Sequence, residues 1–590
     1  MISTPNQRPP VRETPPVSPF TPPASQSSLA EAVSEDLPVK ISNIQGNIIG
    51  GFNKDHQTLL FLRLRRDGNV RVHVRHFRRW LAILTPFVAT AEEVLAFNRL
   101  FKMIRSRRQA ETRTVQATWI NIAFSFEMLK FLSSDAERFT DEAFREGMAA
   151  RAVGVLSDPA DPAAEGNPAN WVFGGPGDEV DVVITVASDD PHELSLTVEG
   201  IETSIYGGRT PDGDPVNSGV QIVYKQQGAT LPQPLTGHEQ FGWLDGVSQP
   251  GIRGRMEEKT GEFITPRQNP DDLNQGKPGQ DLLWPGEFVF GYPGQDPNAT
   301  AKEGGINKQG PDSLRKAGSE EKPVGPDWAQ DRSFLVIRRL RQDVPGFHAF
   351  LKTQGVNPEL LGAKLVGRWP SGAPIMRATT ADSPQLGNND CANLHFEFQE
   401  ESDPIPRQEP NPGLCSDTQF PQSQGDRTGA VCPFAAHIRK TYPRDDTGTL
   451  GPQVNEVVTQ THRLLRRGIP YGDPYLLPSG NPDNAKDSGN RGLVFAAYQT
   501  SIVDQFEFVQ RAWANNPDFK DKSTGGALVS GHDLIIGQSN GPNGSRERRC
   551  PVSINGERKE LVAPADWVIP TGGGYYFAPS INALEYLASQ

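Results

Sequence analysis

The segment SFLVIRRLR, residues 333–341, decides the fold, because a pattern already present in the first half of the chain begins again there. Hydrophobic periodicity and turn signals predict a strand here and then, in order, helices over 346–354 and 358–366, strands over 393–399 and 492–500, a helix over 502–515 and a strand over 574–578. This half therefore has the approximate order β-α-β-β-α-β.

The first half shows the same order. The predicted strands cover 58–65, 118–125, 180–187 and 219–225, and the main helices 91–105 and 191–201, with shorter helical pieces over 126–132 and 141–156. Thr90 and Glu93 have the spacing of a capping box, and Asp190 is a favourable N-cap. Two such units predict an α+β protein of two ferredoxin-like lobes, each with an antiparallel sheet and peripheral helices.

Composition divides the chain further. We expect a disordered Pro/Ser-rich tail over 1–40, an N-terminal lobe over 41–254, a loop-rich Gly/Pro insertion over 255–331 and a C-terminal lobe over 332–590. The insertion is predicted to hold one strand, 287–292.

Charge and cysteine usage exclude several classes of protein. The net charge of −12 speaks against a nucleic-acid partner. No run of 18 apolar residues predicts a membrane span, and the first 40 residues lack a signal-peptide pattern, so a cytoplasmic location is only the default expectation. The four cysteines form no C-x-x-C pair, which argues against a thiolate metal site and leaves one or two disulfides open.

Three polar segments stand out as candidates for chemistry. They are GHEQFGWLDGVSQPG (237–251), which contains Asp245 and Gly246, CPFAAHIRKTYPR (432–444), which contains His437, and HRLLRRGIPYG (462–472), which contains Arg466. Each alone has an ordinary structural explanation: an Asx turn, one structural histidine among ten, and a surface arginine pair.

Together, in this order and at these intervals, the segments resemble the dye-decolorizing peroxidases. That family carries the G-x-x-D-G turn, an A-H-I-R-K-x-x-P-R segment and an R-x-G-I-P-Y-G segment. NIQGNIIGGF (43–52), GLVFAAYQ (492–499) and GHDLIIGQ (531–538) are similar to further family segments. The resemblance covers roughly residues 41–590, favours one of the larger subgroups, and implies a fold of the dimeric α+β barrel type.

The resemblance implies one haem b per chain, with His437 as the iron ligand and Asp533 as acceptor of the other imidazole N–H. Asp245 would be the distal acid–base residue. Arg466 would be the distal arginine, because the family arginine lies four residues before the turn proline, here Pro470. The interval between His437 and Arg466 is longer than the family pattern, which weakens this last assignment.

Further residues take supporting roles in the same resemblance. Gly246 belongs to a turn in which backbone can approach a flat ligand. Leu493 and Phe495 would shape access to the iron, and Arg444 and Arg439 would pair with the haem carboxylates. Trp513 and Tyr475 are candidates for a surface radical that oxidises bulky dyes, although Trp513 has an equal claim to a packing role.

The implied reaction reduces hydrogen peroxide and oxidises dyes, phenols or other small aromatic reductants in one-electron steps at high-valent iron. Free aspartate titrates at about 3.9 and free histidine at about 6.5. An aspartate base therefore stays ionised in mildly acidic solution, where a histidine would be protonated. A guanidinium remains charged throughout and stabilises negative charge on the departing oxygen.

Two other classes of protein remain open from the sequence. A haem carrier or iron-handling protein on the same fold would keep His437 but would not need both Asp245 and Arg466. A cofactor-free carbohydrate- or partner-binding protein would also suit Gly/Pro-rich loops with aromatic residues. The physiological electron donor, manganese oxidation and a homo-oligomeric state are left undecided.

Overall fold

The structure is a computed structural model. It describes residues 37–108, 115–207, 218–267, 276–295, 325–405, 415–447, 456, 458–475, 489–522 and 528–590. The predicted tail thus lies mostly outside the described residues. Its last part does not, because β1 (Pro38–Val39) pairs in parallel with β7 (Arg255–Met256) and Val39 is fully buried. Regular structure therefore begins ahead of Ile41.

The first half of the chain forms an antiparallel sheet of four strands in the order β3-β4-β2-β5. The strands are β2 (His56–Leu64), β3 (Thr118–Phe124), β4 (Val182–Ser188) and β5 (Val220–Ala229). With the strands counted in chain order, this is the arrangement 2-3-1-4 of a ferredoxin-like lobe.

The second half repeats the arrangement. Its strands are β10 (Ser333–Gln342), the short pair β11 (Leu465–Arg466) and β12 (Ile469–Tyr471), β13 (Gly492–Gln499) and β16 (Val568–Ala578). They lie in the order β11/β12-β13-β10-β16, again 2-3-1-4. The register pair Phe577–Phe124 joins β16 to β3, so the two halves form one nine-stranded sheet.

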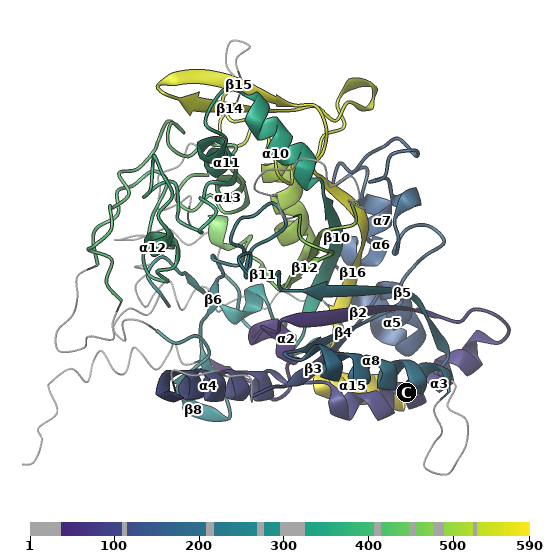
Figure 1. Ribbon diagram of the computed structural model, residues 1–590. Helices are drawn as coiled ribbons and strands as arrows, with labels where there is room; N and C mark the ends of the chain where they lie inside the picture. Colours follow the sequence, from purple (N-terminus) through teal and green to yellow (C-terminus); the bar gives the residue numbers. More distant parts are fainter. Residues whose placement is uncertain are drawn as a thin grey trace, which may run out of the picture.

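The two ends of this sheet approach each other. A Cβ atom on Gly228 of β5 would lie 2.6 Å from Ile469 Cγ2 and 2.9 Å from the carbonyl oxygen of Pro470, so only glycine permits this contact between β5 and β12. In Figure 1, β10 and β16 run steeply through the centre while β2, β4 and β5 cross below them. Alternate residues such as Phe61 and Leu335 share the core that the curved sheet encloses.

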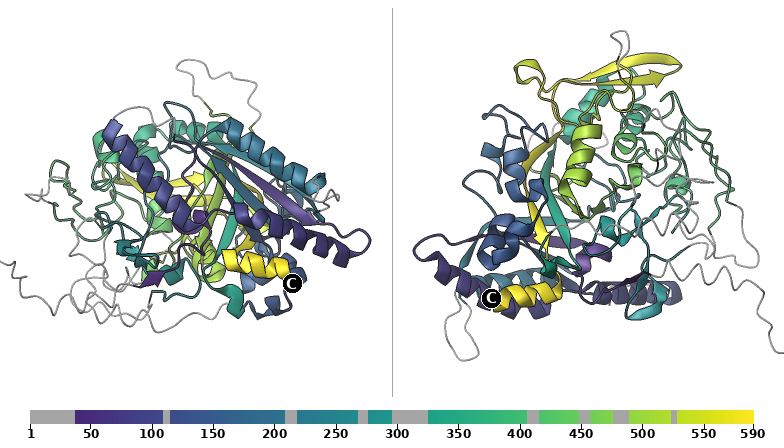
Figure 2. Two further views of the ribbon diagram at one scale, coloured as in Figure 1. Left: turned by 90° about the horizontal axis from the view of Figure 1, so that it is seen from below. Right: turned by 180° about the vertical axis from the view of Figure 1, so that it is seen from behind.

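Helices cover the outer face of the N-terminal strands. α3 (Val70–Leu84), α8 (Pro191–Tyr206) and α15 (Ile581–Ser589) supply Phe77, Trp80, Val198 and Leu584 to a cluster with Leu60 and Leu62 of β2. Figure 2 shows these helices as a layer below the strands. Both faces of β2 are therefore buried, which explains its nearly continuous apolar sequence.

The remaining elements surround this framework. The other helices are α2 (Gly46–Ile49), α4 (Ala91–Arg108), α5 (Phe126–Leu132), α6 (Glu142–Glu146), α7 (Met148–Arg151), α10 (Val344–Thr353), α11 (Pro358–Val366), α12 (Pro384–Gly387), α13 (His437–Thr441) and two consecutive π-helical segments, Ile502–Glu507 and Val509–Ala514. The other strands are β6 (Gly251–Ile252), β8 (Lys259–Phe263), β9 (Leu282–Leu283), β14 (Arg548–Ile554) and β15 (Glu557–Ala563). The described part of 255–331 thus contains short strands as well as loops.

Local sequence signals explain several element ends. The Thr90 backbone N–H donates to Glu93 Oε2 over 2.8 Å and the Glu93 N–H to Thr90 Oγ1 over 3.2 Å, which completes the predicted capping box. Asp190 accepts the backbone N–H groups of His192 and Glu193 at the start of α8, as predicted. The predicted helix 358–366 matches α11.

Two predicted strands are wrong. Residues 287–292 form turns, because Pro285, Gly286 and Gly291 interrupt the chain while Phe288 and Val289 are simply buried. The segment 393–399 also forms no ladder: its alternating apolar residues fill a separate cluster, and its last N–H groups donate to the carboxylate of Asp445. β11 and β12 take the place of this strand in the sheet. Helices α3 and α15 and the β14–β15 hairpin were missed.

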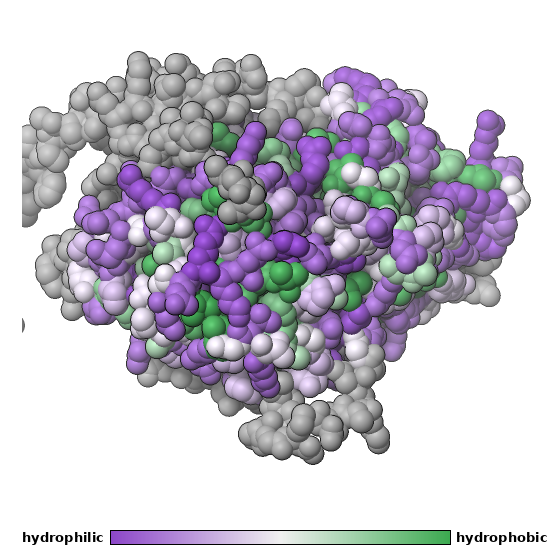
Figure 3. Space-filling model, turned by 90° about the horizontal axis from the view of Figure 1, so that it is seen from above, coloured by the Kyte–Doolittle hydropathy of each residue, from purple (hydrophilic) through white to green (hydrophobic). Residues whose placement is uncertain are grey.

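The cysteines and the surface add two observations. Cys391 and Cys415 form a disulfide, and Cys432 and Cys550 are buried thiols. No helix in the described part of the chain is long and apolar enough to cross a membrane. Figure 3 shows the upper face of the molecule as mostly hydrophilic, with hydrophobic residues in small separate groups.

Candidate active site

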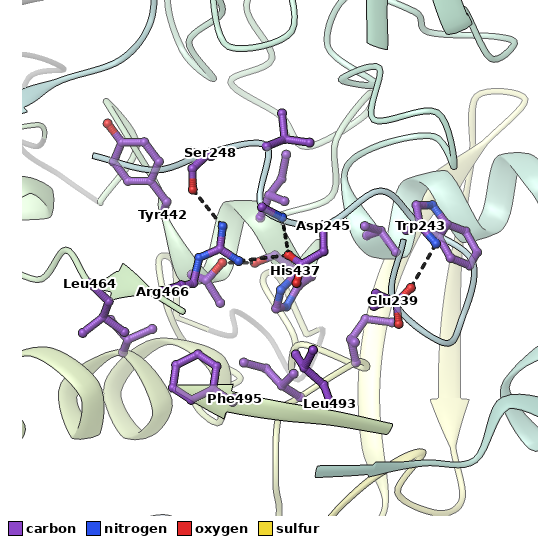
Figure 4. Close-up of a pocket in the computed structure, with 18 of the residues that line it drawn as sticks. Glu239, Trp243, Asp245, Ser248, His437, Tyr442, Leu464, Arg466, Leu493 and Phe495 are labelled. Carbon is purple, nitrogen blue, oxygen red and sulfur yellow. Dashed lines mark hydrogen bonds and ion pairs between the residues drawn. The ribbon is translucent and has the colours of Figure 1, made fainter. Parts of the chain in front are cut away.

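A cavity of about 270 Å³ lies against the outer side of the C-terminal strands. Leu340 of β10 and Leu493 and Phe495 of β13 line it, while the alternate residues Val494 and Ala496 of β13 face the enclosed core. Since side chains alternate across a strand, the register of β13 decides which residues reach the cavity. His437, Asp245 and Arg466 line the same cavity (Figure 4), as do Gly246 and Arg444.

His437 is the first residue of α13, and its side chain is 28% exposed. Its Nδ1 lies 2.8 Å from Oδ2 of Asp533, which is fully buried. The other oxygen of Asp533 accepts the backbone N–H groups of Ile535 and Ile536. Burial opposes the imidazolium form, but the charge and hydrogen bond of Asp533 outweigh it, and the pKa of His437 is raised. Among the described residues no hydrogen-bond partner of Nε2 is found, so this nitrogen can bind a ligand in the cavity.

Asp245 reaches the cavity from the loop after β5. Its backbone N–H donates to the carbonyl of Gly237 over 3.0 Å, and its Oδ1 accepts the Gly246 N–H over 2.6 Å. Gly246 has a φ of +72°, which strongly favours glycine in this turn. The carboxylate therefore belongs to a tight turn, yet 39% of the side chain is exposed.

Arg466 meets this carboxylate. Its Nη1 lies 3.1 Å from Asp245 Oδ1, and its Nη2 donates to the carbonyl of Ser248 over 2.7 Å. The side chain of Gln249 accepts the Arg466 N–H and donates to the Arg466 carbonyl. The loop that carries Asp245 is thus hydrogen-bonded to Arg466 of β11 through Ser248 and Gln249 as well as through the ion pair. Arg467 is directed elsewhere, to the carbonyl end of α2.

Further arginines give the cavity a cationic wall. Arg368, Arg444 and Arg463 line it in addition to Arg466. Arg463 pairs with Asp281 over 2.7 Å and its guanidinium lies 3.5 Å from the centre of the Tyr442 ring. Burial lowers the pKa of Arg368 to about 9, with a further contribution from the charges of Arg444 and Arg466. Such a wall suits a ligand that carries carboxylates.

Arg439 does not line the cavity. Its guanidinium pairs with Asp446 over 2.8 Å and donates to the carbonyl groups of Asp426 and Cys432. These contacts use its donors inside the protein, so only Arg444 of the two arginines proposed for haem carboxylates is brought to the cavity.

The two residues proposed as surface radical sites lie outside the cavity lining. Trp513 is 3% exposed and packs its ring against Phe519, Phe508 and His462. Tyr475 is half-buried beside Arg491. His462 itself lines the cavity, so its ring contact with Trp513 is one connection between that indole and the cavity.

Some cavity residues were not singled out from the sequence. Glu239 is part of the quoted glycine-rich segment, but nothing in its spacing marked it. Tyr442 lies within the quoted segment 432–444 but was given no role, and Arg368 lies outside the three quoted segments.

Comparisons with known proteins identify the family. Residues 43–230 match the model of the DyP dimeric alpha+beta barrel domain. A dye-decolorizing peroxidase of Mycena epipterygia is 30% identical over 94% of this chain and 88% of the relative. The chain belongs to the dye-decolorizing peroxidase family.

Other dye-decolorizing peroxidases give the same result. One from Mycetinis scorodonius is 28% identical over 97% of this chain and 92% of its own length. A solved variant of the Pleurotus ostreatus protein superposes with a TM-score of 0.67 at 30% identity, covering 93% of this chain and 99% of that one. The Auricularia auricula-judae structure gives a TM-score of 0.64 at 27% identity, covering 93% and 100%. The two-lobed α+β prediction is therefore confirmed as the fold of this family.

Proposed function

We propose that this member of the family is a haem peroxidase that reduces hydrogen peroxide and oxidises aromatic donors such as dyes and phenols. One observation carries the proposal. The imidazole of His437, backed by Asp533, and the ion pair of Asp245 with Arg466 line one cavity with a cationic wall. When bound there, one haem b would supply the iron and the redox chemistry.

The residues around His437 fit a haem ligand. Nδ1 is occupied by Asp533, which fixes the orientation of the ring and leaves Nε2 for the iron. The hydrogen bond to a carboxylate makes the imidazole a more basic ligand, which favours high oxidation states of iron. Asp533 is in turn held by two backbone N–H groups, so this support is rigid.

Asp245 would move the proton of the peroxide. Its carboxylate would accept a proton from one peroxide oxygen and return it to the other. The side chain is 39% exposed and lines the cavity, so a molecule as small as peroxide could reach it. Arg466, held by Ser248 and Asp245, would provide a permanent positive charge to stabilise the negative charge that develops on the departing oxygen.

The walls of the cavity would orient the haem. Arg444, whose Nη1 also donates to the carbonyl of Phe396 over 2.6 Å, is the proposed partner of a haem carboxylate. Leu493 and Phe495 line the cavity and would restrict the space beside the iron, and the turn at Gly246 would bring backbone close to the flat ligand. Small donors would react at the cavity, and Tyr475 is the more exposed of the two proposed relays for bulky dyes.

Two absorption spectra test the proposal. The purified chain, supplied with haem during expression, is expected to show a Soret band, and a few equivalents of peroxide should convert it to an oxidised species that phenols reduce. A Soret band with no response to peroxide would favour a haem carrier. No Soret band at all would exclude both haem functions.

A further inference from the structure

Glu239 is a cavity residue that the proposed reaction does not use. Its carboxylate accepts three hydrogen bonds: from the Trp243 N–H to Oε1 over 3.0 Å, and from the Phe241 N–H over 2.9 Å and Gln342 Nε2 over 2.5 Å to Oε2. An ionised carboxylate is an acceptor only and has enough lone pairs for all three. No cation is among these partners.

These contacts close a small turn just before Asp245. The Glu239 N–H donates to the carbonyl of Trp243, and the Gly242 N–H donates back to the carbonyl of Glu239, both over 2.9 Å. Gly242 has a φ of +99°, a backbone conformation that would be strained for a residue with a side chain. The carboxylate of Glu239 therefore fills the inside of the turn, and the chain continues from it through Leu244 to Asp245.

The same carboxylate connects the turn to the sheet. Gln342, its third donor, is the last residue of β10, and its own backbone N–H donates to the carbonyl of Arg491. Trp243 connects the turn to a different element, since its Nε1 donates over 2.9 Å to the carbonyl of Arg368, which follows α11. In Figure 4, Glu239 lies between Trp243 and the part of the cavity that contains Asp245.

We propose that Glu239 is the positioning residue for Asp245: its carboxylate ties the Glu239–Trp243 turn to β10 and so fixes where Asp245 enters the cavity. This inference rests on the proposed function, because it concerns the position of the Asp245 carboxylate that the proposed function uses as the base. It assigns Glu239 no contact with peroxide.

Electrostatics adds a second expectation. Burial raises the pKa of Glu239 to about 7, and the charge of Asp245 acts in the same direction, against the three hydrogen bonds. Other titratable groups around the turn include His238, which precedes Glu239 and pairs with Leu244, and His348 of α10, which contacts the Phe241 carbonyl. Arg368 and, on β10, Arg338 also lie nearby. Protonation of Glu239 removes acceptor capacity from the turn, so the position of Asp245 is expected to depend on pH near neutrality.

Cyanide binding tests the position of Asp245 without peroxide chemistry. Hydrogen cyanide must lose its proton to bind iron, and a base aimed at the ligand site speeds this step. We would measure the binding rate of potassium cyanide by stopped flow for the holoenzyme and for Glu239→Ala, Glu239→Gln, Gln342→Leu and Asp245→Asn. The matched control is Glu202→Gln, a surface glutamate paired with Lys225.

With the Soret band retained, Glu239→Ala is expected to bind cyanide about tenfold more slowly, and Gln342→Leu to show a smaller loss. The cyanide-binding rate of Glu239→Gln should fall between those of the wild type and Glu239→Ala. If protonation of Glu239 alters the turn, the wild-type rate should change near pH 7, and this change should be absent in Glu239→Gln. Glu202→Gln should match the wild type. If Glu239→Ala loses haem, Gln342→Leu decides, because it removes only the connection to β10.

The outcomes separate the two proposals. If Asp245→Asn is slow but Glu239→Ala and Gln342→Leu bind cyanide within about twofold of the wild type, the positioning role is wrong and the proposed function stands. If Asp245→Asn itself binds cyanide at the wild-type rate, the base assignment in the proposed function fails.

Discussion

Arg466 and Arg467 are neighbours in the chain, but their guanidinium groups serve different parts of the molecule. Arg466 pairs with Asp245 over 3.1 Å in the cavity. Arg467 is partly buried and donates over 2.9 Å to the carbonyls of Asn47 and Ile48 at the end of α2, and also to that of Ile49. A sheet strand separates adjacent side chains in this way, so one arginine is available for chemistry and the other completes a helix end.

This difference predicts opposite phenotypes for two adjacent substitutions. Arg466→Ala should slow the reaction with peroxide by about 10² to 10³, as loss of a positioned charge in an active site does, with little effect on unfolding. Arg467→Ala should lower the free energy of unfolding by about 2–3 kcal/mol, because it leaves buried carbonyls without donors, and should keep most of the peroxide rate. Stopped-flow kinetics and urea titration measure both. Equal kinetic losses would show that the assignment of Arg466 is wrong.

His437→Ala should remove the iron ligand. We expect at least about tenfold weaker haem retention and no normal Soret band, while circular dichroism shows the fold intact. Asp533→Asn is the matched variant: it keeps the imidazole but loses the carboxylate, so haem should remain with affinity or activity reduced by about 10- to 100-fold. A Soret band in His437→Ala identical to that of the wild type would exclude His437 as the ligand.

The substitution Trp513→Phe distinguishes a packing role of Trp513 from a role as an electron relay. Because the indole is almost fully buried among Phe508, Phe519 and His462, a dye cannot contact it directly. We expect a loss of stability on the order of 1 kcal/mol and unchanged turnover of a bulky dye relative to a small phenol. A selective loss of dye turnover would instead establish Trp513 as a relay.

The raised pKa of Glu239 predicts a pH-dependent stability of the cofactor-free protein. Between about 4.5, where the unfolded carboxyl ionises, and about 7, the folded protein holds a proton that the unfolded chain has released. Stability should therefore fall as pH rises through this window, by at most roughly 3 kcal/mol from this group. Urea titrations from pH 4.5 to 8 give the free energy of unfolding at each pH, and it should fall less steeply with pH for Glu239→Gln than for the wild type. The same pH dependence in both proteins would contradict the raised pKa of Glu239.

The fold was predictable where local signals and burial agree. The caps at Thr90 and Asp190 and the apolar strands β10 and β13 follow from propensity and periodicity. The second strand of the C-terminal lobe was not predictable, because β11 and β12 are only two and three residues long. The alternating segment 393–399 instead owes its pattern to packing in a loop.

The site residues were likewise predictable only in part. Family motifs pointed to His437, Asp533, Asp245 and Arg466, which the structure brings to one cavity or directly behind it. Motif position could not show that Arg439 is fully used by Asp426 and Asp446, because those partners depend on how the loop folds back. Glu239 was missed for the related reason that its role lies in backbone contacts, which no residue pattern displays.

The proposed function depends on Asp245 as the base and acid of the peroxide reaction. The stopped-flow rate at which peroxide oxidises the haem-loaded Asp245→Asn variant at mildly acidic pH tests this role. The amide keeps the shape of the side chain and its neighbours but cannot accept the proton, so we expect a rate lower by about 10² to 10⁴ with an unchanged Soret band before mixing. Oxidation of this variant at the wild-type rate would contradict the assignment.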